Sequence, residues 1–188
     1  MGLSELDIIS RYFNQSGLAA DPLHHAAVSL GIGDDCAGLR LAAGQELMLS
    51  MDVLVEGVHF PASANPADIA RRALAVNLSD LAAMGAQPLG FMLGLTLPDA
   101  QPYWLEGFSQ GLKASATRYG CPLLGGNLTR GPRQIAIQVQ GQVPAGMALL
   151  RSGARAGDKV FVSGSLGTAG LALQYVLGEL PGVQLADQ

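Results

Sequence analysis

The sequence predicts an α+β domain in which helices cover one face of a mixed or antiparallel sheet. Segments 65–85 and 101–119 repeat apolar residues at the spacing of amphipathic helices. Segment 89–97 is almost continuously apolar and 134–143 alternates, and both patterns are typical of strands. Helices on one face leave the other face uncovered, so we expect a second copy of this apolar chain to pair there.

The N-terminal part is expected to hold one helix followed by turns and extended segments. Ser4, with Asp7 three residues later, resembles a capping box, and the helix that follows would place on one face Leu6, Ile9 and Phe13. A turn rich in glycine and aspartate is expected at 31–35. Two extended runs, 38–42 and 46–55, come next.

The clearest helix starts at Asn65 as N-cap, with Pro66 at its first position, and should stop near Gly85. The second long helix should end before Gly120, a residue suited to a helix C-terminus. After it, Leu123 and Leu124 lead into an expected Gly125-Gly126 turn.

The chain is divided into residues 1–145, an N-terminal domain, and residues 146–188, a linker and the beginning of a C-terminal α/β domain. A polar connector at 151–158 precedes an expected short strand at 159–163 and a helix at 167–178. About thirty residues are too few for a separate core. We therefore expect the chain to be part of a longer protein with a truncated C-terminal domain.

Composition excludes several classes of protein. Of the 188 residues, 49% are hydrophobic and 14% charged, which excludes an intrinsically disordered chain. The net charge of −4 argues against a nucleic-acid partner, and no apolar run is long enough to span a membrane. The acidic N-terminus is unlike a signal peptide, and Cys36 and Cys121 are interpreted as reduced structural thiols of a cytoplasmic protein.

Three carboxylates stand at positions that favour a metal site. Asp35 lies in the glycine-flanked turn, Asp52 in an apolar strand and Asp80 in an apolar helix. A buried carboxylate must be paired or bound to a metal, and oxygen ligands suit Mg²⁺. The alternative is that each aspartate caps a turn or faces solvent.

Two further sites are weaker signals. Segment 125–131 (GGNLTRG) has glycines that let backbone N–H groups approach phosphate, although Gly-Gly-Asn is also common in hairpins. His59 follows the second extended run, and a lone histidine there is more often structural than functional.

Four ordered segments together closely resemble thiamine-monophosphate kinases. They are GIGDDCA at 31–37, SMDVLVEGVHF at 50–60, AVNLSDLAAMGA at 75–86 and GGNLTRG at 125–131. The resemblance runs from Ser4 to about Gly170. It implies the fold of the aminoimidazole-ribonucleotide synthetase superfamily, in which the N-terminal sheets of two subunits pair into a barrel.

The resemblance also implies a reaction and its residues. ATP would phosphorylate thiamine monophosphate to thiamine diphosphate with several Mg²⁺ ions, in a homodimer formed through the N-terminal domain. It places metal ligands at Asp35, Ser50, Met51, Asp52, Asp80 and Asn127. It assigns ATP contacts to Gly126, Asn127 and Arg151, and a substrate contact to His59.

Two positions depart from the family pattern. Many relatives have Thr at Met51, where only the main-chain carbonyl could bind a metal here. Many have Asp at the position of Asn127, so the ligand here would be neutral and would bind its metal ion more weakly.

The leading hypothesis is direct in-line phosphoryl transfer, carried by positioning and charge stabilisation. Two alternatives stay open. One is another ATP-using enzyme of the superfamily, such as a selenophosphate synthetase, although Cys36 is in the wrong context for one. The other is an inactive module for dimerisation and nucleotide binding.

Overall fold

A computed structural model describes residues 3–162 and 164–179 of the chain. It divides into two units, Met1–Leu150 and Arg151–Gln188, which are described separately. The division falls five residues after the boundary expected at residue 145. The roles assigned to the two parts remain predictions.

The first unit is built on a four-stranded sheet with the strand order β3-β6-β4-β5. Its strands are β3 (Gln45–Val55), β4 (Gln87–Leu97), β5 (Leu123–Arg130) and β6 (Gln134–Pro144). β6 pairs antiparallel with both β3 and β4, whereas β4 and β5 are parallel. The sheet is therefore mixed, as expected, and β3 and β5 form its two edges.

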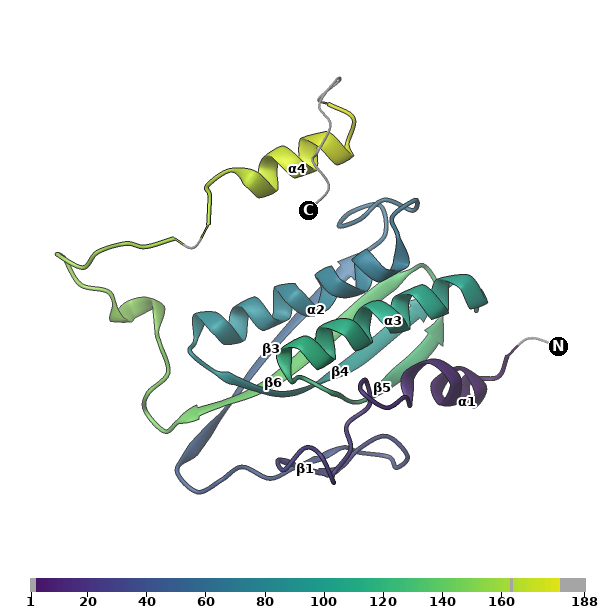
Figure 1. The fold of residues 1–188 in the computed structure, drawn as a ribbon, viewed down its shortest axis with the longest axis horizontal. Helices are drawn as coiled ribbons and strands as arrows, with labels where there is room; N and C mark the ends of the chain where they lie inside the picture. The colour runs from purple at the N-terminus through teal and green to yellow at the C-terminus, as the bar shows by residue number, and fades with distance from the viewer. Residues whose placement is uncertain (1–2, 163, 180–188) are drawn as a thin grey trace. The chain divides into compact units, whose positions relative to one another are not determined.

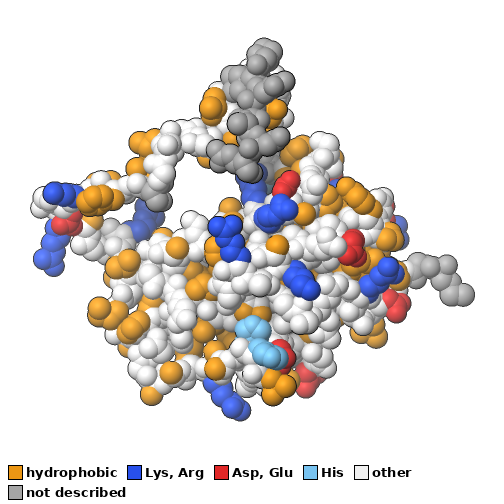
Figure 2. Space-filling view, viewed as in Figure 1, with side chains coloured by type: hydrophobic (Ala, Val, Ile, Leu, Met, Phe, Trp, Pro, Cys, Tyr) orange, Lys and Arg blue, Asp and Glu red, His pale blue; other side chains and the backbone are white. Residues whose placement is uncertain are grey.

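Helices α2 (Pro66–Ala83) and α3 (Pro102–Tyr119) lie side by side over one face of this sheet (Figure 1). The side chain of Asn65 accepts from the N–H of Ala67 at 2.8 Å, and Gly120 adopts the left-handed conformation that ends α3. Both helices thus begin and end within two residues of the predicted positions. Figure 2 shows Lys and Arg side chains dispersed over this helical side of the unit.

The core lies between the helices and the sheet. Strand residues of one parity face it, because side chains alternate along a strand. Its largest fully buried members on these elements are Leu74, Leu81, Phe91, Leu95, Leu105, Phe108, Leu112, Ile135 and Ile137. Gly111 lets the helices approach closely, since a Cβ there would stand 2.4 Å from the carbonyl oxygen of Ala67 on α2.

The N-terminal helix differs from its predicted form. The capping box at Ser4 and Asp7 is confirmed, and α1 (Glu5–Ile8) continues into the π-helical η1 (Ile9–Phe13). The wider π-helical turn shifts the buried face to Ile8, Tyr12 and Phe13, and Leu6 is 77% exposed. Of the three residues expected on one helix face, Phe13 is buried, Ile9 is half-buried and Leu6 is exposed.

Two extended segments also differ from expectation. The run predicted at 38–42 is reduced to β2 (Gly38–Leu39), which pairs with β1 (Val28–Leu30). The turn expected at Gly125-Gly126 is wrong, because both glycines lie inside β5 and pair with β4. The parallel pairing with a distant strand overrides the local tendency of Gly-Gly to turn.

The second unit contains the short helix η2 (Arg151–Gly153) and α4 (Thr168–Val176), and α4 agrees with the helix predicted at 167–178. Residues 159–162 form no strand, contrary to prediction, and Ser163 lies outside the described residues. No residue of α4 is buried, because so short a unit cannot enclose its apolar side chains. Among the described helices, none is long and apolar enough to cross a membrane.

Candidate active site

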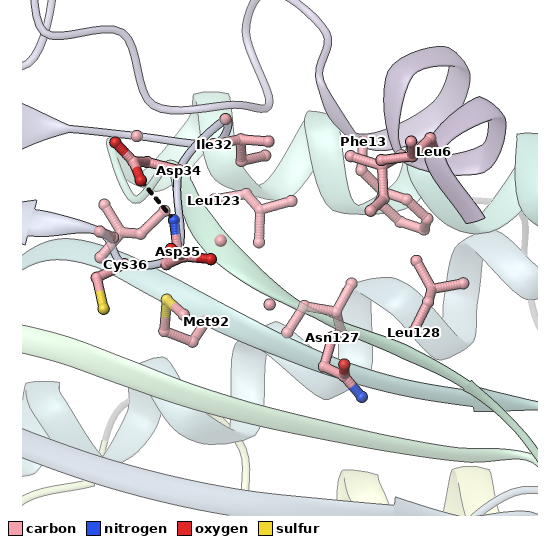
Figure 3. A pocket seen from close by; sticks show the side chains of 18 residues that line it. Leu6, Phe13, Ile32, Asp34, Asp35, Cys36, Met92, Leu123, Asn127 and Leu128 are labelled. Atoms are coloured by element: carbon pink, nitrogen blue, oxygen red, sulfur yellow. Dashed lines mark hydrogen bonds between the residues drawn. The ribbon is translucent and has the colours of Figure 1, made fainter.

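A cavity of about 450 Å³ opens on the first unit between α1–η1, the 31–37 loop and strands β4 and β5. This is within the size range of small-molecule sites. Its apolar wall includes Leu6, Ile9 and Phe13, the three residues that the sequence places on one helix face. Figure 3 shows this wall on one side and the acidic loop on the other.

Polar groups reach the cavity from two elements. Asp34 and Asp35 come from the loop, where an Asp34 carboxylate oxygen accepts from the N–H of Asp35 at 2.8 Å, and both side chains are exposed. Asn127 comes from β5 and is also exposed. Figure 3 shows Asp35 and Asn127 on two sides of the cavity. The loop and the glycine segment, separated by about ninety residues of sequence, thus line one cavity.

Gly126 has a structural requirement of its own. A Cβ at this position would stand 2.0 Å from the carbonyl oxygen of Leu93 on β4. Only glycine therefore fits this pairing of β4 and β5. The close approach explains the glycine without any ligand, and it leaves the assigned ATP contact as a prediction.

A second group of predicted residues lies where β3 meets α2. The Ser50 hydroxyl donates to an Asp80 carboxylate oxygen at 2.5 Å. The N–H of Asp52 donates to the amide oxygen of Asn77 at 3.0 Å. Asp52 is half-buried and Asp80 exposed, so neither is the fully buried carboxylate that the sequence suggested.

Met51 points away from this junction. Because side chains alternate along β3, Met51 lies on the sheet face opposite the helices, where it is 60% exposed. Its side chain is therefore separate from those of Ser50 and Asp52. Only its main chain remains near them, as the predicted carbonyl ligand requires.

The structure does not gather all three predicted carboxylates in one place. Asp35 and Asn127 lie beside edge strand β5, and Asp52 and Asp80 lie at the opposite edge strand, β3. At the usual strand spacing the two edges are about 14 Å apart. Within residues 3–162 and 164–179, no three His, Cys, Asp or Glu side chains could hold one ion. The expectation that the three aspartates form one cluster within a chain is wrong.

His59 is exposed in the loop after β3, and that loop is held at several points. The N–H of Val55 donates to His59 Nδ1 at 3.0 Å, so a neutral imidazole carries its proton on Nε2. Arg72 on α2 donates to the His59 carbonyl oxygen at 2.6 Å. Glu56 is ion-paired with Arg133, whose guanidinium stands 5.0 Å from the centre of the Trp104 ring. These contacts leave Nε2–H as a fixed donor.

Arg151 begins the second unit, in η2, and is exposed. Its ATP contact therefore remains a prediction from the resemblance. Both cysteines are free: Cys121 is buried, and burial raises the pKa of its thiol to about 12. Cys36 is exposed at the cavity, which corrects its interpretation as a structural thiol.

The arrangement was compared with known proteins. Residues 33–143 match the family described as AIR synthase related protein, N-terminal domain. The chain belongs to this family. The matched residues run from the acidic loop through β6, so the AIR synthase related domain contains both groups of predicted residues.

Several relatives of this AIR synthase related chain are named thiamine-monophosphate kinase. Thiamine-monophosphate kinase of Escherichia coli K12 is 47% identical over the whole chain, which covers 55% of that protein. The crystal structure of thiamine-monophosphate kinase from Stenotrophomonas maltophilia K279a has a TM-score of 0.80 and 42% identity, over 96% of this chain and 55% of that one. The structure of AaThiL complexed with AMPPCP and TMP has a TM-score of 0.70 and 35% identity, over 77% and 47%. The chain spans about half the length of these relatives.

Two residues in contact with the site were missed in the sequence. Asn77 is fully buried in α2, and Arg72 holds the His59 carbonyl. A signal for Asn77 was present, because it is the one polar residue among the apolar core positions of that helix, which are Ile69, Ala70, Ala73, Leu74, Leu78 and Leu81. No sequence signal marks Arg72, because its contact with the His59 carbonyl depends on how the loop after β3 folds against α2.

Proposed function

We propose that this chain is the ATP- and Mg²⁺-binding part of a thiamine-monophosphate kinase, which transfers the γ-phosphoryl group of ATP to thiamine monophosphate. The observation that carries the proposal is the similarity, along the entire chain, to proteins with that name. The solved relative complexed with AMPPCP and TMP supports the pairing of these two substrates. The cavity, with its polar loop and apolar wall, supports a small-molecule site.

The oxygen donors on the two edges fit Mg²⁺. This ion is usually held by one or two carboxylates together with substrate phosphates and water, so a cage of three protein carboxylates is not required. Asp52, Asp80, Ser50 and the Met51 carbonyl would hold metal at β3, and Asp35 and Asn127 would hold it at the cavity. When bound, the ions neutralise the phosphates and the charge that develops between them.

The reaction requires positioning more than proton transfer. A phosphate oxygen of thiamine monophosphate attacks the γ-phosphorus of ATP and forms a new P–O bond. The bond from that phosphorus to the β–γ bridging oxygen breaks, and ADP leaves with the electron pair. The attacking oxygen is already ionised at neutral pH, so no strong general base is needed. His59 would donate Nε2–H to the acceptor substrate, and Gly126 and Arg151 would contact ATP.

A homodimer would complete the site. Leu47, Leu49 and Met51 on β3 are 41%, 56% and 60% exposed on the face opposite the helices. A second copy covering this apolar row would place its own sheet against it, as expected for a barrel. The two edges of one chain are far apart, so the Asp35 group of one copy and the Asp52 group of the other would form one site.

The test is whether the chain forms thiamine diphosphate from ATP, MgCl₂ and thiamine monophosphate. Chromatography measures the thiamine diphosphate, and a second assay measures the release of ADP. We expect ADP release to depend on thiamine monophosphate. Asp52→Asn should lose at least about 99% of the rate, as expected when a charge-stabilising group is removed. Asp68→Asn, which removes an exposed carboxylate of α2, is the matched control. Equal rates with and without the acceptor would refute the proposal.

The second candidate is a nucleotide-binding and dimerisation module without activity. It is favoured by the fact that the chain spans about half of its relatives. It predicts ATP binding and a dimer in sedimentation, with no turnover in this chain and turnover in the longer protein. Use of ATP and the two free cysteines favour a cytoplasmic location.

A further inference from the structure

Three polar side chains connect helix α2 to strand β3 and the loop after it. Arg72 donates to the His59 carbonyl, Asn77 accepts from the Asp52 N–H, and Asp80 accepts from the Ser50 hydroxyl. Arg72 and Asp80 are exposed, whereas Asn77 has no exposed surface. Asn77 is therefore the buried member of the three connections.

The amide of Asn77 is paired at both ends. Its oxygen accepts from the Asp52 N–H at 3.0 Å, and its nitrogen donates to the carbonyl oxygen of Ala73 at 2.9 Å. Asp52 pairs with Ile137 of the neighbouring strand β6. The Asn77 amide oxygen therefore adds a contact from helix α2 to an N–H group that already lies within the sheet.

A packing role alone does not account for this residue. The neighbouring buried positions of α2 include Ala73, Leu74 and Leu78, and a leucine at position 77 would continue that apolar face. Burying an amide is unfavourable unless its hydrogen bonds are made, and here one of them reaches the main chain of a predicted metal ligand.

We propose that Asn77 is a positioning residue that fixes the main chain at Asp52 and so holds the Asp52 carboxylate in place relative to Asp80. The metal-binding part of this inference rests on the proposed function. Asn77 touches neither metal nor substrate, and it acts through the strand.

The first test isolates the bond to the strand. In Asn77→Ser the hydroxyl can still donate to the carbonyl four residues earlier, but it is too short to reach Asp52. We expect amide hydrogen exchange at Asp52 to accelerate at least tenfold, measured by NMR on the whole chain. The control Leu78→Val, which trims a buried neighbour on the same helix, should leave that amide within twofold of the original. Unchanged exchange in Asn77→Ser would overturn the proposal.

A measurement without substitution guards against a variant that fails to fold. A scalar coupling across the hydrogen bond, from the Asp52 amide nitrogen to the Asn77 side-chain carbonyl carbon, should be present in the unaltered chain. Its absence would also contradict the proposal.

The second test uses Mn²⁺ as a paramagnetic probe of an oxygen-ligand site. We expect Mn²⁺ to broaden the Asp52 and Asp80 amide signals, with a midpoint about tenfold higher in Asn77→Ser and nearly unchanged in Leu78→Val. Equal midpoints in Asn77→Ser and the unaltered chain would refute the effect on the metal site. If Mn²⁺ broadened neither signal in the unaltered chain, the metal site of the proposed function would fail. The exchange rate at Asp52 would still decide whether Asn77 fixes the strand.

Discussion

The Ser50 hydroxyl lies 2.5 Å from an Asp80 carboxylate oxygen, although thirty residues separate them in the chain. The bond joins an edge strand to the helix that covers it. Because Asp80 is exposed, its carboxylate remains accessible to solvent and to ions. The pair is therefore suited to a binding role, and it contributes little to the stability of the core.

Replacing Asp80 by Asn should separate binding from stability. The amide can still accept from Ser50 but carries no charge, so we expect the Mg²⁺ concentration for half-maximal thiamine diphosphate formation to rise about tenfold or more. The free energy of unfolding should change by less than about 1 kcal/mol, because the side chain is exposed. Asp68→Asn on the same helix should leave the Mg²⁺ dependence unchanged and lower the free energy of unfolding by less than about 1 kcal/mol, because it removes only an exposed ion pair. An unchanged Mg²⁺ dependence in Asp80→Asn would exclude Asp80 as a ligand.

Gly126 and Gly125 form a matched pair for testing why β5 contains glycine. A Cβ at 126 would collide with the Leu93 carbonyl oxygen at 2.0 Å, whereas one at 125 would meet the flexible end of Met92 at 3.3 Å. We expect Gly126→Ala to lower the free energy of unfolding by about 3 kcal/mol and Gly125→Ala by less than about 1 kcal/mol, measured by urea denaturation. Equal losses would mean that the close approach of β5 to β4 is not what requires glycine at 126.

The two thiols should differ in reactivity. Cys36 is exposed, whereas burial raises the pKa of Cys121 from 9.0 to about 12, so Cys121 has almost no thiolate at pH 8. A chromogenic disulfide reagent should modify one thiol in the folded protein and two in urea. Cys36→Ser should leave none reactive before unfolding.

The raised pKa of Cys121 also makes the free energy of unfolding depend on pH. The folded state favours the neutral thiol, so its contribution is complete below pH 9.0 and is lost as pH rises toward 12. A Cys121→Ala chain should therefore lose less stability than the unaltered chain between pH 8 and pH 10.5. Parallel losses would contradict the assigned burial.

The N-terminal cap predicts a dependence on acid pH. The Ser4 hydroxyl, and then the Ser4 N–H, hold the pKa of the Asp7 carboxyl below its ordinary value of 3.8. The stabilisation is therefore present above pH 3.8 and is lost as pH falls through the lowered pKa. Asp7→Asn should have a lower urea midpoint than the unaltered chain at pH 7, and the difference should shrink near pH 2.5. A constant difference would show that the charge of Asp7 is not involved.

Local signals explain which elements could be predicted. The Asn65-Pro66 start, the Gly120 end and the Ser4–Asp7 box act within one helical turn, and each is found in the structure. The Gly125-Gly126 segment was mistaken for a turn because its strand depends on pairing with β4, more than thirty residues earlier. The set of buried residues on the N-terminal helix depends on a π-helical turn that has no simple apolar period.

The candidate site was predictable in its parts but not in its assembly. Asp52 and Asp80 could be singled out because a carboxylate in an apolar strand or helix is unusual. Asp35 was singled out by its glycine-flanked turn. Their separation follows from the strand order β3-β6-β4-β5, which places β3 and β5 at opposite edges of the sheet. Strand order depends on long-range pairing, so sequence spacing could not reveal it.

That separation leads to a decisive test of the dimer. If one site combines Asp35 of one copy with Asp52 of the other, homodimers of Asp35→Asn or Asp52→Asn have two defective sites. A mixed dimer has one site with both substitutions and one with neither. Equal mixing makes half of the dimers mixed, so unfolding and refolding the two variants together should restore about a quarter of the original rate.

The same mixture distinguishes a site built within one chain. In that case every site in the mixed dimer keeps one substitution, and the rate stays at the level of the separate variants. Leu49→Glu, which places a charge in the exposed apolar row of β3, should prevent the recovery by separating the copies. Recovery that persists in monomers, measured by sedimentation, would contradict a shared site, because no partner would then be available to supply the second group.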